Sequence, residues 1–233
     1  MVDKQKNFKS NYIDVVYNVK DKPFTNYPGQ LIYYLINRFN IKQGSKILEI
    51  GSGRGEFINE FQKLGNNAYA VDSSIATSEY FPKINFSKLD LENEKLPFDD
   101  ETFDIVFSKS VIEHFYYPED IMKETFRVLK KGGIVLTLTP EWNYIFLSFY
   151  EDYTHRTPFT KVSLEDLKKI VGFKNIQVES FKQLPILWSK NILSIFFSFI
   201  SYLTRILVPE KFRMKNKWVR FSKEIMILCK AEK

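Results

Sequence analysis

A turn containing three glycines follows a run of strand-forming residues. The stretch ILEIGSGRGEF occupies residues 47–57 and places glycine at positions 51, 53 and 55. Glycine loses more conformational freedom on folding than any other residue, so three of them in five positions need a compensating reason. Where a strand of a parallel sheet ends in such a turn, a ligand can approach the backbone closely. The sequence therefore predicts a buried strand at 46–51 whose carboxyl end faces a ligand.

The rest of the chain alternates between strand and helix patterns. Strands are predicted at 46–51, 67–72, 84–91, 103–108, 134–139, 175–181 and 224–231. Helices are predicted at 28–41, 56–64, 120–129 and about 163–171. Strands separated by helices over most of the chain indicate an α/β fold with a doubly wound, seven-stranded sheet.

All four predicted helices carry end signals, and the first two are expected to stop at Gln43-Gly44 and at Gly65. The helix at 120–129 is expected to stop at Lys130-Lys131-Gly132-Gly133, a cationic last turn followed by glycine. Ser163 is expected to cap the helix that it begins, with Asp166 completing a capping box.

The length of 233 residues suits one domain, and we expect 1–233 to form it. Within it, 1–45 is expected to be an N-terminal helical cap, and 184–222 is expected to be an insertion between the last two strands. A single cysteine excludes an internal disulfide and a cysteine-based zinc site, which favours a reducing, cytoplasmic location. The first twenty residues show no secretory signal. The net charge of +6 favours an anionic partner only weakly, because basic composition is also common in Lys-rich proteomes.

The ligand at the glycine turn is expected to be a nucleoside. Asp72 ends the second predicted strand, where a carboxylate can accept hydrogen bonds from the two hydroxyls of a ribose. A dinucleotide fingerprint would have a third glycine where Glu56 stands. Glu49, two residues before the first glycine, would repel a pyrophosphate but suits a ligand with ammonium and sulfonium groups.

Several motifs in register extend this hypothesis. ILEIGSGRGEF fits E/D-x-G-x-G-x-G, VDSS (71–74) supplies an acidic strand end, and KLDLENEKLPFDDETFDIVFSKSVIEHF (88–115) contains D…LPF…FD…EH. RVLKKGGIVLTLTP (127–140) follows as helix and strand. These motifs resemble the class I S-adenosylmethionine-dependent methyltransferases, in the small-molecule branch similar to quinone-biosynthesis methyltransferases, over residues 28–183 and the last strand. The resemblance implies a Rossmann-like, three-layer αβα fold whose sheet is mostly parallel with the last strand antiparallel.

The resemblance also implies roles for individual residues. Asp72 with Ser73 would bind the ribose of S-adenosylmethionine, and Asp90 with Leu91 would bind the adenine. The methionine end would be held by Glu49, Gly51, Gly53, Gly55 and Ser108. A solvated loop carboxylate is the alternative role for Asp90.

The acceptor is less well defined. Enzymes that methylate amino groups of nucleic acids carry a D/N-P-P-Y motif after the fourth strand, where this chain has Ser108-Lys109-Ser110-Val111. Methylation of pyrimidine carbon needs a cysteine nucleophile in the site, and Cys229 falls in the last predicted strand instead. A hydroxyl acceptor needs a base, and histidine has a suitable pKa. His155, in EDYTHRTPFT (151–160), is expected to act as the base or to orient the acceptor; shaping the pocket from within its loop is the alternative. His114 is the second catalytic candidate, with a structural role at a helix start as its alternative.

The insertion has an unusual composition. Its uncharged run at 191–204 is shorter than the ~20 residues that span a bilayer, and it would form a helix with one narrow polar stripe. The segment 211–223 then combines Lys and Arg with aromatic residues and has no acid. One interpretation is a contact with an anionic membrane surface through 186–220, with a lipid-linked acceptor. The other is a lid or dimer helix.

The sequence thus predicts a cytoplasmic, membrane-peripheral S-adenosylmethionine-dependent methyltransferase that acts on a small or lipid-linked acceptor, most simply at a hydroxyl oxygen. An RNA methyltransferase and a cofactor-binding pseudo-enzyme are the alternatives, and no nucleic-acid partner is expected. No metal is expected, because the two histidines and the carboxylates show no ligand spacing.

Overall fold

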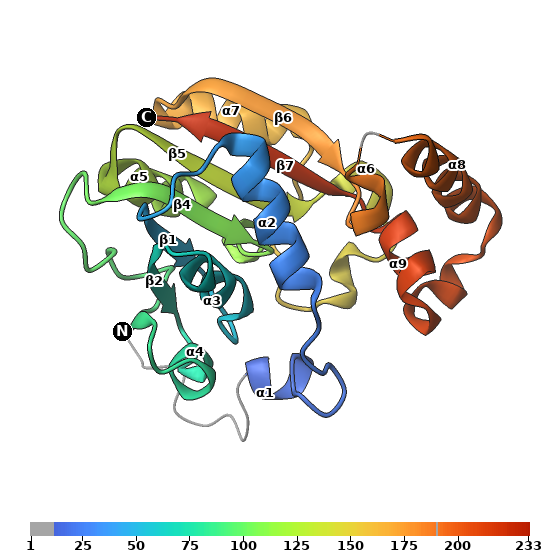
Figure 1. The fold of residues 1–233 in the computed structure, drawn as a ribbon, viewed down its shortest axis with the longest axis horizontal. Helices are drawn as coiled ribbons and strands as arrows, with labels where there is room; N and C mark the ends of the chain where they lie inside the picture. The colour runs from blue at the N-terminus through green and yellow to red at the C-terminus, as the bar shows by residue number, and fades with distance from the viewer. Residues whose placement is uncertain (1–11, 190) are drawn as a thin grey trace.

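A computed structural model describes residues 12–189 and 191–233. One seven-stranded sheet runs through the molecule in the order β3-β2-β1-β4-β5-β7-β6 (Figure 1). Its strands are β1 (Lys46–Ile50), β2 (Asn67–Asp72), β3 (Asn85–Lys88), β4 (Phe103–Lys109), β5 (Leu129–Pro140), β6 (Lys174–Phe181) and β7 (Met226–Glu232). The pairs among β3, β2, β1, β4 and β5 are parallel, whereas β7 is antiparallel to both β5 and β6. The predicted Rossmann-like sheet with an antiparallel last strand is confirmed.

Helices cover both faces of the sheet (Figure 1). The helices longer than one turn are α1 (Tyr12–Val16), α2 (Tyr27–Phe39), α3 (Glu56–Lys63), α4 (Ala76–Tyr80), α5 (Pro118–Val128), α6 (Trp142–Ile145), α7 (Lys161–Val171), α8 (Ile192–Leu207) and α9 (Lys217–Lys223). Short 3-10 turns are η1 (Ile112–His114), η2 (Phe149–Glu151), η3 (Pro185–Leu187) and η4 (Glu210–Lys215).

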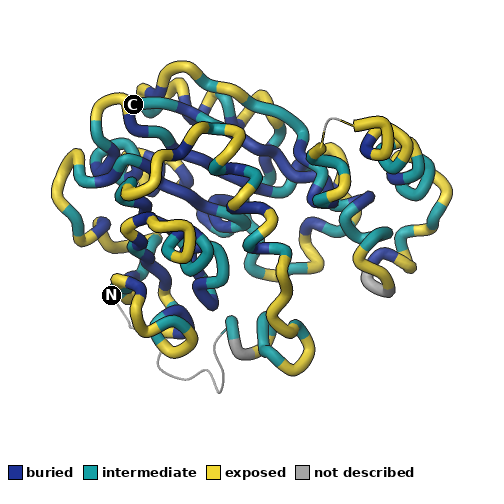
Figure 2. Tube along the Cα trace, viewed as in Figure 1, coloured by how far each residue is buried: buried dark blue, intermediate teal, exposed yellow. Residues whose placement is uncertain are grey.

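The alternation of side chains along each strand divides the core into two layers. In β1, Ile47 packs with the apolar faces of α2 and α3, whereas Leu48 and Ile50 pack on the side of α5 and α7. Both clusters consist of buried, mostly aliphatic and aromatic residues, and Figure 2 shows the central strands as buried. This three-layer packing fixes the carboxyl ends of β1, β2 and β4 side by side.

Three local predictions differ from the structure. The stop signal for α5 was wrong: α5 ends at Val128, and the chain already pairs with β4 from Leu129, while Gly132 and Gly133 form backbone hydrogen bonds with Lys233. The cap of α7 is Thr160, not Ser163. Ser163 is the third helical residue and exchanges hydrogen bonds with Thr160 as its capping-box partner.

The third difference concerns β3, which ends at Lys88 and not at residue 91. Beyond it, the side chain of Asp90 accepts hydrogen bonds from the backbone of Glu92 and the side chain of Asn93, so the chain turns there.

Candidate active site

A cavity of about 830 Å³ opens at the carboxyl ends of β1, β2 and β4. Its size is in the range of small-molecule sites. Of the residues predicted for the site, the wall contains Glu49, Gly51, Gly53, Asp72, Ser73, Asp90, Leu91 and His114. Gly55, Ser108 and His155 lie outside the wall. The topology therefore gathers most of the predicted residues around one space.

The glycine turn has a steric reason at Gly51. Its φ of 68° lies in the left-handed region, and a Cβ atom there would lie 2.4 Å from Cγ2 of Val111. Gly55 serves packing instead, because it caps α3 and a Cβ there would lie 2.8 Å from Cγ2 of Thr77. The two glycines thus bring backbone close to the cavity and to α4, respectively.

Glu49 is a buried carboxylate on the cavity wall. Its Oε2 accepts a hydrogen bond of 2.8 Å from the backbone N–H of Ile58, in the first turn of α3. Burial raises its pKa well above the ordinary value, and the charges of Asp72 and Glu56 act in the same direction. A positively charged group in the cavity would favour the ionised form of this carboxyl.

Asp72 links the end of β2 to the glycine turn. Its Oδ2 accepts a hydrogen bond from the backbone of Gly53 at 2.7 Å, and its Oδ1 accepts one from the backbone of Ser74 at 2.8 Å. Burial raises the pKa of Asp72, while these backbone N–H groups oppose that rise. Each carboxylate oxygen retains a further lone pair for a ligand hydroxyl.

Strand alternation explains the position of Ser108. Its side chain is buried and its Oγ has no hydrogen-bond partner among the described residues. The next residue, Lys109, points to the cavity instead and lies 5.7 Å from the ring centre of Phe57. Burial lowers the pKa of Lys109 to about 8, although the charge of Glu113 opposes this. The alternation of inward and outward positions along 103–109 could have indicated Lys109.

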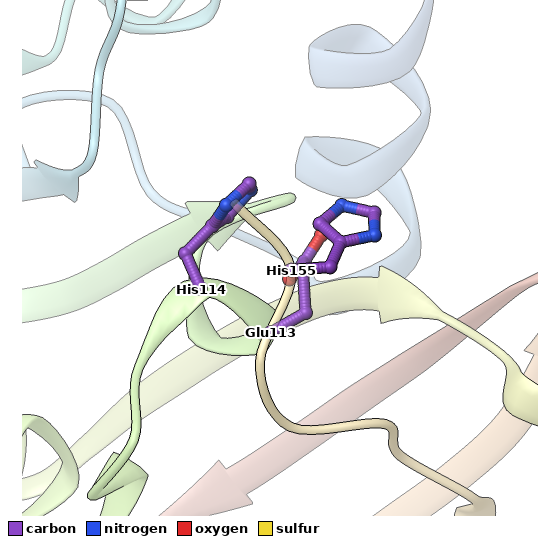
Figure 3. A group of neighbouring side chains, drawn as sticks. All are labelled: Glu113, His114 and His155. Atoms are coloured by element: carbon purple, nitrogen blue, oxygen red, sulfur yellow. The ribbon is translucent and has the colours of Figure 1, made fainter. Parts of the chain in front are cut away.

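The two histidines lie together (Figure 3), with ring centres 4.8 Å apart. Only His114 belongs to the wall. Its Nδ1 lies 2.9 Å from Oγ1 of Thr154, and Nδ1 of His155 lies 2.6 Å from the backbone oxygen of Phe149. Burial lowers the pKa of both rings, that of His114 to about 4, so both are neutral near pH 7.

The segment before α2 forms part of the cavity wall through Tyr12, Ile13 and Tyr17. Arg54 ties it to the glycine turn, because its Nη1 donates to the backbone oxygens of Tyr17 and Lys22 at 3.0 and 2.7 Å. The sequence predicted a helical cap in this region but gave these residues no site role. Their only signal is the short run YIDVVYNV (12–19), in which two tyrosines are combined with apolar residues.

Comparison with protein families matches residues 48–137 to the methyltransferase domain family. The chain is 32% identical to a sterol 24-C-methyltransferase of Aspergillus fumigatus, over 48% of this chain and 32% of that protein. It is 30% identical to an uncharacterized protein of Methanocaldococcus jannaschii, over 75% and 73% of the two chains. It is 28% identical to a ubiquinone biosynthesis O-methyltransferase of Pelagibacter ubique, over 52% and 57%. The chain thus spans about a third of the sterol enzyme and somewhat more than half of the ubiquinone enzyme.

Solved structures show the same fold. A SAM-dependent methyltransferase from Archaeoglobus fulgidus superposes with a TM-score of 0.62 at 20% identity, covering 88% of this chain and 94% of that one. A Haemonchus contortus phosphoethanolamine N-methyltransferase, solved with S-adenosylhomocysteine, gives a TM-score of 0.63 at 19% identity, covering 87% and 52%. Together, the motif register, the sheet order and these similarities show that the chain belongs to the class I S-adenosylmethionine-dependent methyltransferases, whose cofactor is S-adenosylmethionine.

Proposed function

We propose that this protein transfers the methyl group of S-adenosylmethionine to a hydroxyl oxygen of a small or lipid-linked acceptor. The observation that carries the proposal is a single cavity whose wall contains Asp72, Asp90 and His114 together. Cofactor and acceptor could therefore lie in line within a single space, as displacement at a methyl carbon requires.

The residues present suit the cofactor. Asp72 is placed to accept hydrogen bonds from the ribose hydroxyls, and Asp90 with Leu91 borders the space for the adenine. Glu49, which is buried and lies on the wall, suits the ammonium group of the methionine end. Bound S-adenosylmethionine supplies an electrophilic methyl group on a positively charged sulfur.

The acceptor must then lie beside His114 and lose a proton. Because Nδ1 of His155 donates to the backbone oxygen of Phe149, its Nε2 carries a lone pair, and the ring is neutral and able to act as a base. His155 lies behind the wall, next to His114, so we propose that it reaches the acceptor past that ring. If so, His155→Ala should lower kcat and leave the cofactor Kd unchanged.

The nature of the acceptor is suggested by the similar proteins. Those named above include methyltransferases of sterol and of ubiquinone biosynthesis, both of which are lipids. We propose an oxygen acceptor because the ubiquinone enzyme is named an O-methyltransferase. The sterol enzyme is named a C-methyltransferase and so methylates carbon.

The orientation of α8 supports a lipid-linked acceptor. The polar stripe of this helix faces inward: Ser201 is buried and donates to Oγ of Ser222 at 3.0 Å, and Ser198 accepts from Nζ of Lys182 at 2.6 Å. The opposite, apolar face points to solvent, with Ile195 exposed to 71% and Phe199 to 59%. Figure 2 shows exposed positions along much of α8. A helix that packs on its own core would show the reverse pattern, so we propose that this face contacts a membrane surface.

The basic segment contributes less to that contact than its composition suggests. Arg213 is buried and forms ion pairs with Glu151, Glu210 and Glu224, and Arg220 pairs with Glu224 as well. Insertion of apolar side chains, more than attraction to anionic lipid, should therefore drive binding. Among the described residues, no helix combines the length and hydrophobicity needed to cross a bilayer.

Two experiments test the proposal. Turnover is measured with radiolabelled S-adenosylmethionine on quinol, lipid-linked and RNA acceptors. Methylation of RNA alone, or cofactor binding without any turnover, would favour the RNA methyltransferase or the pseudo-enzyme instead.

The second experiment is vesicle co-sedimentation. Ile195→Glu with Phe199→Glu should abolish binding, whereas Ile170→Glu, which changes an equally exposed residue (77%) on α7, should not. Equal binding by both variants would refute the membrane contact. If the protein is a dimer and only the α8 variant is a monomer, the exposed face of α8 contacts a second copy of the chain and not a membrane.

A further inference from the structure

Three side chains of metal-binding type, Glu113, His114 and His155, lie together beside the cavity wall (Figure 3). Glu113 and His114 belong to η1, directly after β4, and His155 lies in the loop between η2 and α7. One ligand atom from each residue lies within 4.8 Å of the others. Residues distant in the sequence thus meet in one place, which the spacing of histidines and carboxylates along the chain could not reveal.

The hydrogen-bond partners leave one acceptor atom free on each residue. Glu113 is fully buried, and its Oε2 accepts from Oγ1 of Thr139 at 2.9 Å, while its Oε1 has no partner among the described residues. An unpartnered carboxylate oxygen in a buried place is unfavourable without a cation or a donor.

The tautomers of the two rings follow from their partners. The hydroxyl of Thr154 donates to Oδ1 of Asp152 at 2.5 Å, so it accepts from Nδ1 of His114. Nδ1 of His155 donates to the backbone oxygen of Phe149. Each Nε2 therefore carries a lone pair, and each ring is oriented through its other nitrogen, as is usual for metal-binding histidines.

We propose that Glu113, His114 and His155 bind a divalent first-row transition-metal ion of the zinc class. Two neutral imidazoles with one carboxylate form a donor set that suits zinc or iron, whereas magnesium and calcium prefer oxygen ligands alone. Because His114 belongs to the cavity wall, a remaining coordination position could face the cavity.

The backbone already holds the three residues together. The N–H groups of Arg156 and Thr157 donate to the backbone oxygen of Glu113 at 2.8 and 3.0 Å, and Oγ1 of Thr157 donates to the backbone oxygen of Phe115 at 2.7 Å. The ligand atoms lie within 4.8 Å of one another, so small side-chain rotations on this fixed frame would bring them to the roughly 3 Å separation that zinc–ligand distances near 2 Å require.

Binding of the ion does not depend on the proposed function, but its role in methyl transfer rests on it. A metal ion lowers the pKa of a coordinated hydroxyl, so an acceptor bound there could lose its proton without a free imidazole base. The ion and the proposed base use the same lone pair of His155. His155 would therefore be a metal ligand in the metal-bound enzyme and the base in the metal-free enzyme.

The test is titration of the untagged, chelator-treated full chain with Zn²⁺, and with Co²⁺ for its visible spectrum. The chain has two histidines, so removing the affinity tag removes every other imidazole. We expect one ion per chain and at least a 100-fold loss of affinity in His155→Ala. Thr154→Val should weaken binding 10- to 100-fold by releasing the ring of His114 without changing a ligand.

Glu141→Gln is the matched control. Glu141 is a second buried carboxylate with an unpartnered oxygen but lies outside the cluster, so this variant should bind zinc as the wild type does. No binding by the wild type, or equal binding by His155→Ala, would overturn the metal site. S-adenosylhomocysteine affinity and turnover in the presence of chelator are measured separately, so a failure of the methyltransferase proposal is distinguishable from a failure of the metal site.

Discussion

Replacement of Asp72 by alanine separates a cofactor site from a merely structural cavity. The carboxylate closes the glycine turn by accepting from Gly53 and orders the following loop by accepting from Ser74. Its remaining lone pairs would accept from the ribose. A hydrogen bond to a charged group contributes about 1.5–3 kcal/mol, so losing one or two should cost about 2–4 kcal/mol of binding energy. The dissociation constant of S-adenosylhomocysteine should then rise about 30- to 1,000-fold.

Isothermal titration calorimetry measures this effect, with Asp90→Ala as the matched control. Asp90 borders the same cavity, but its carboxylate accepts within its own turn from Glu92 and Asn93, so its removal should weaken binding about tenfold or less. Asp72→Asn keeps one carbonyl oxygen but turns an amide NH₂ toward Gly53 or Ser74, and should fall between the two. Unchanged affinity in Asp72→Ala, with the thermal unfolding temperature retained, would refute the placement of the cofactor.

Three further predictions concern the frame of the site and its core. Gly51→Ala forces a Cβ against Val111 at a φ of 68° and should lower the thermal unfolding temperature and cofactor affinity together, with partial rescue by Val111→Ala. Arg54→Met removes its bonds to the segment before α2 and should make that segment sensitive to limited proteolysis. Lys168→Met should stabilise the protein at pH 7, as measured by urea unfolding. Burial lowers the pKa of Lys168 from 10.5 to about 8, so below pH 8 its charge lowers the free energy of unfolding by up to about 3 kcal/mol. The variant should recover this amount, reduced by the loss of the hydrogen bond from Lys168 to Thr137. Since the unfolded chain binds more protons between pH 8 and 10.5, wild-type stability should gain from this group as pH rises there, and the variant should lose that gain.

The fold could be predicted because its signals are local and periodic. A strand such as β1 alternates sides between Ile47 and Leu48, and both of its faces are covered, so it appears as a continuous apolar run. Helix ends were harder to predict, because tertiary contacts decide them. Lys130 to Gly133 has the composition of a helix stop, yet pairing with β4 and with the C-terminus makes it strand.

Most of the residues predicted for the cofactor do line one cavity, whereas the cluster of Glu113, His114 and His155 was not predicted. Gly51 follows β1, Asp72 ends β2 and Asp90 follows β3 by two residues, so position along the chain determines their place. The cluster of Glu113, His114 and His155 depends instead on how the loop after η2 folds back on η1. No periodic pattern specifies such a loop.

The orientation of α8 also could not be predicted from the sequence. Its composition identified one polar and one apolar face but not which of them meets the protein. Ser201 turns inward because Ser222 offers a partner, and Arg213 is neutralised by acids from three different segments. The contact between Ser201 and Ser222 holds the polar stripe of α8 inward and leaves its apolar face to solvent. The orientation of α8 and the folding of the loop after η2 thus both depend on contacts between segments that are distant in the sequence.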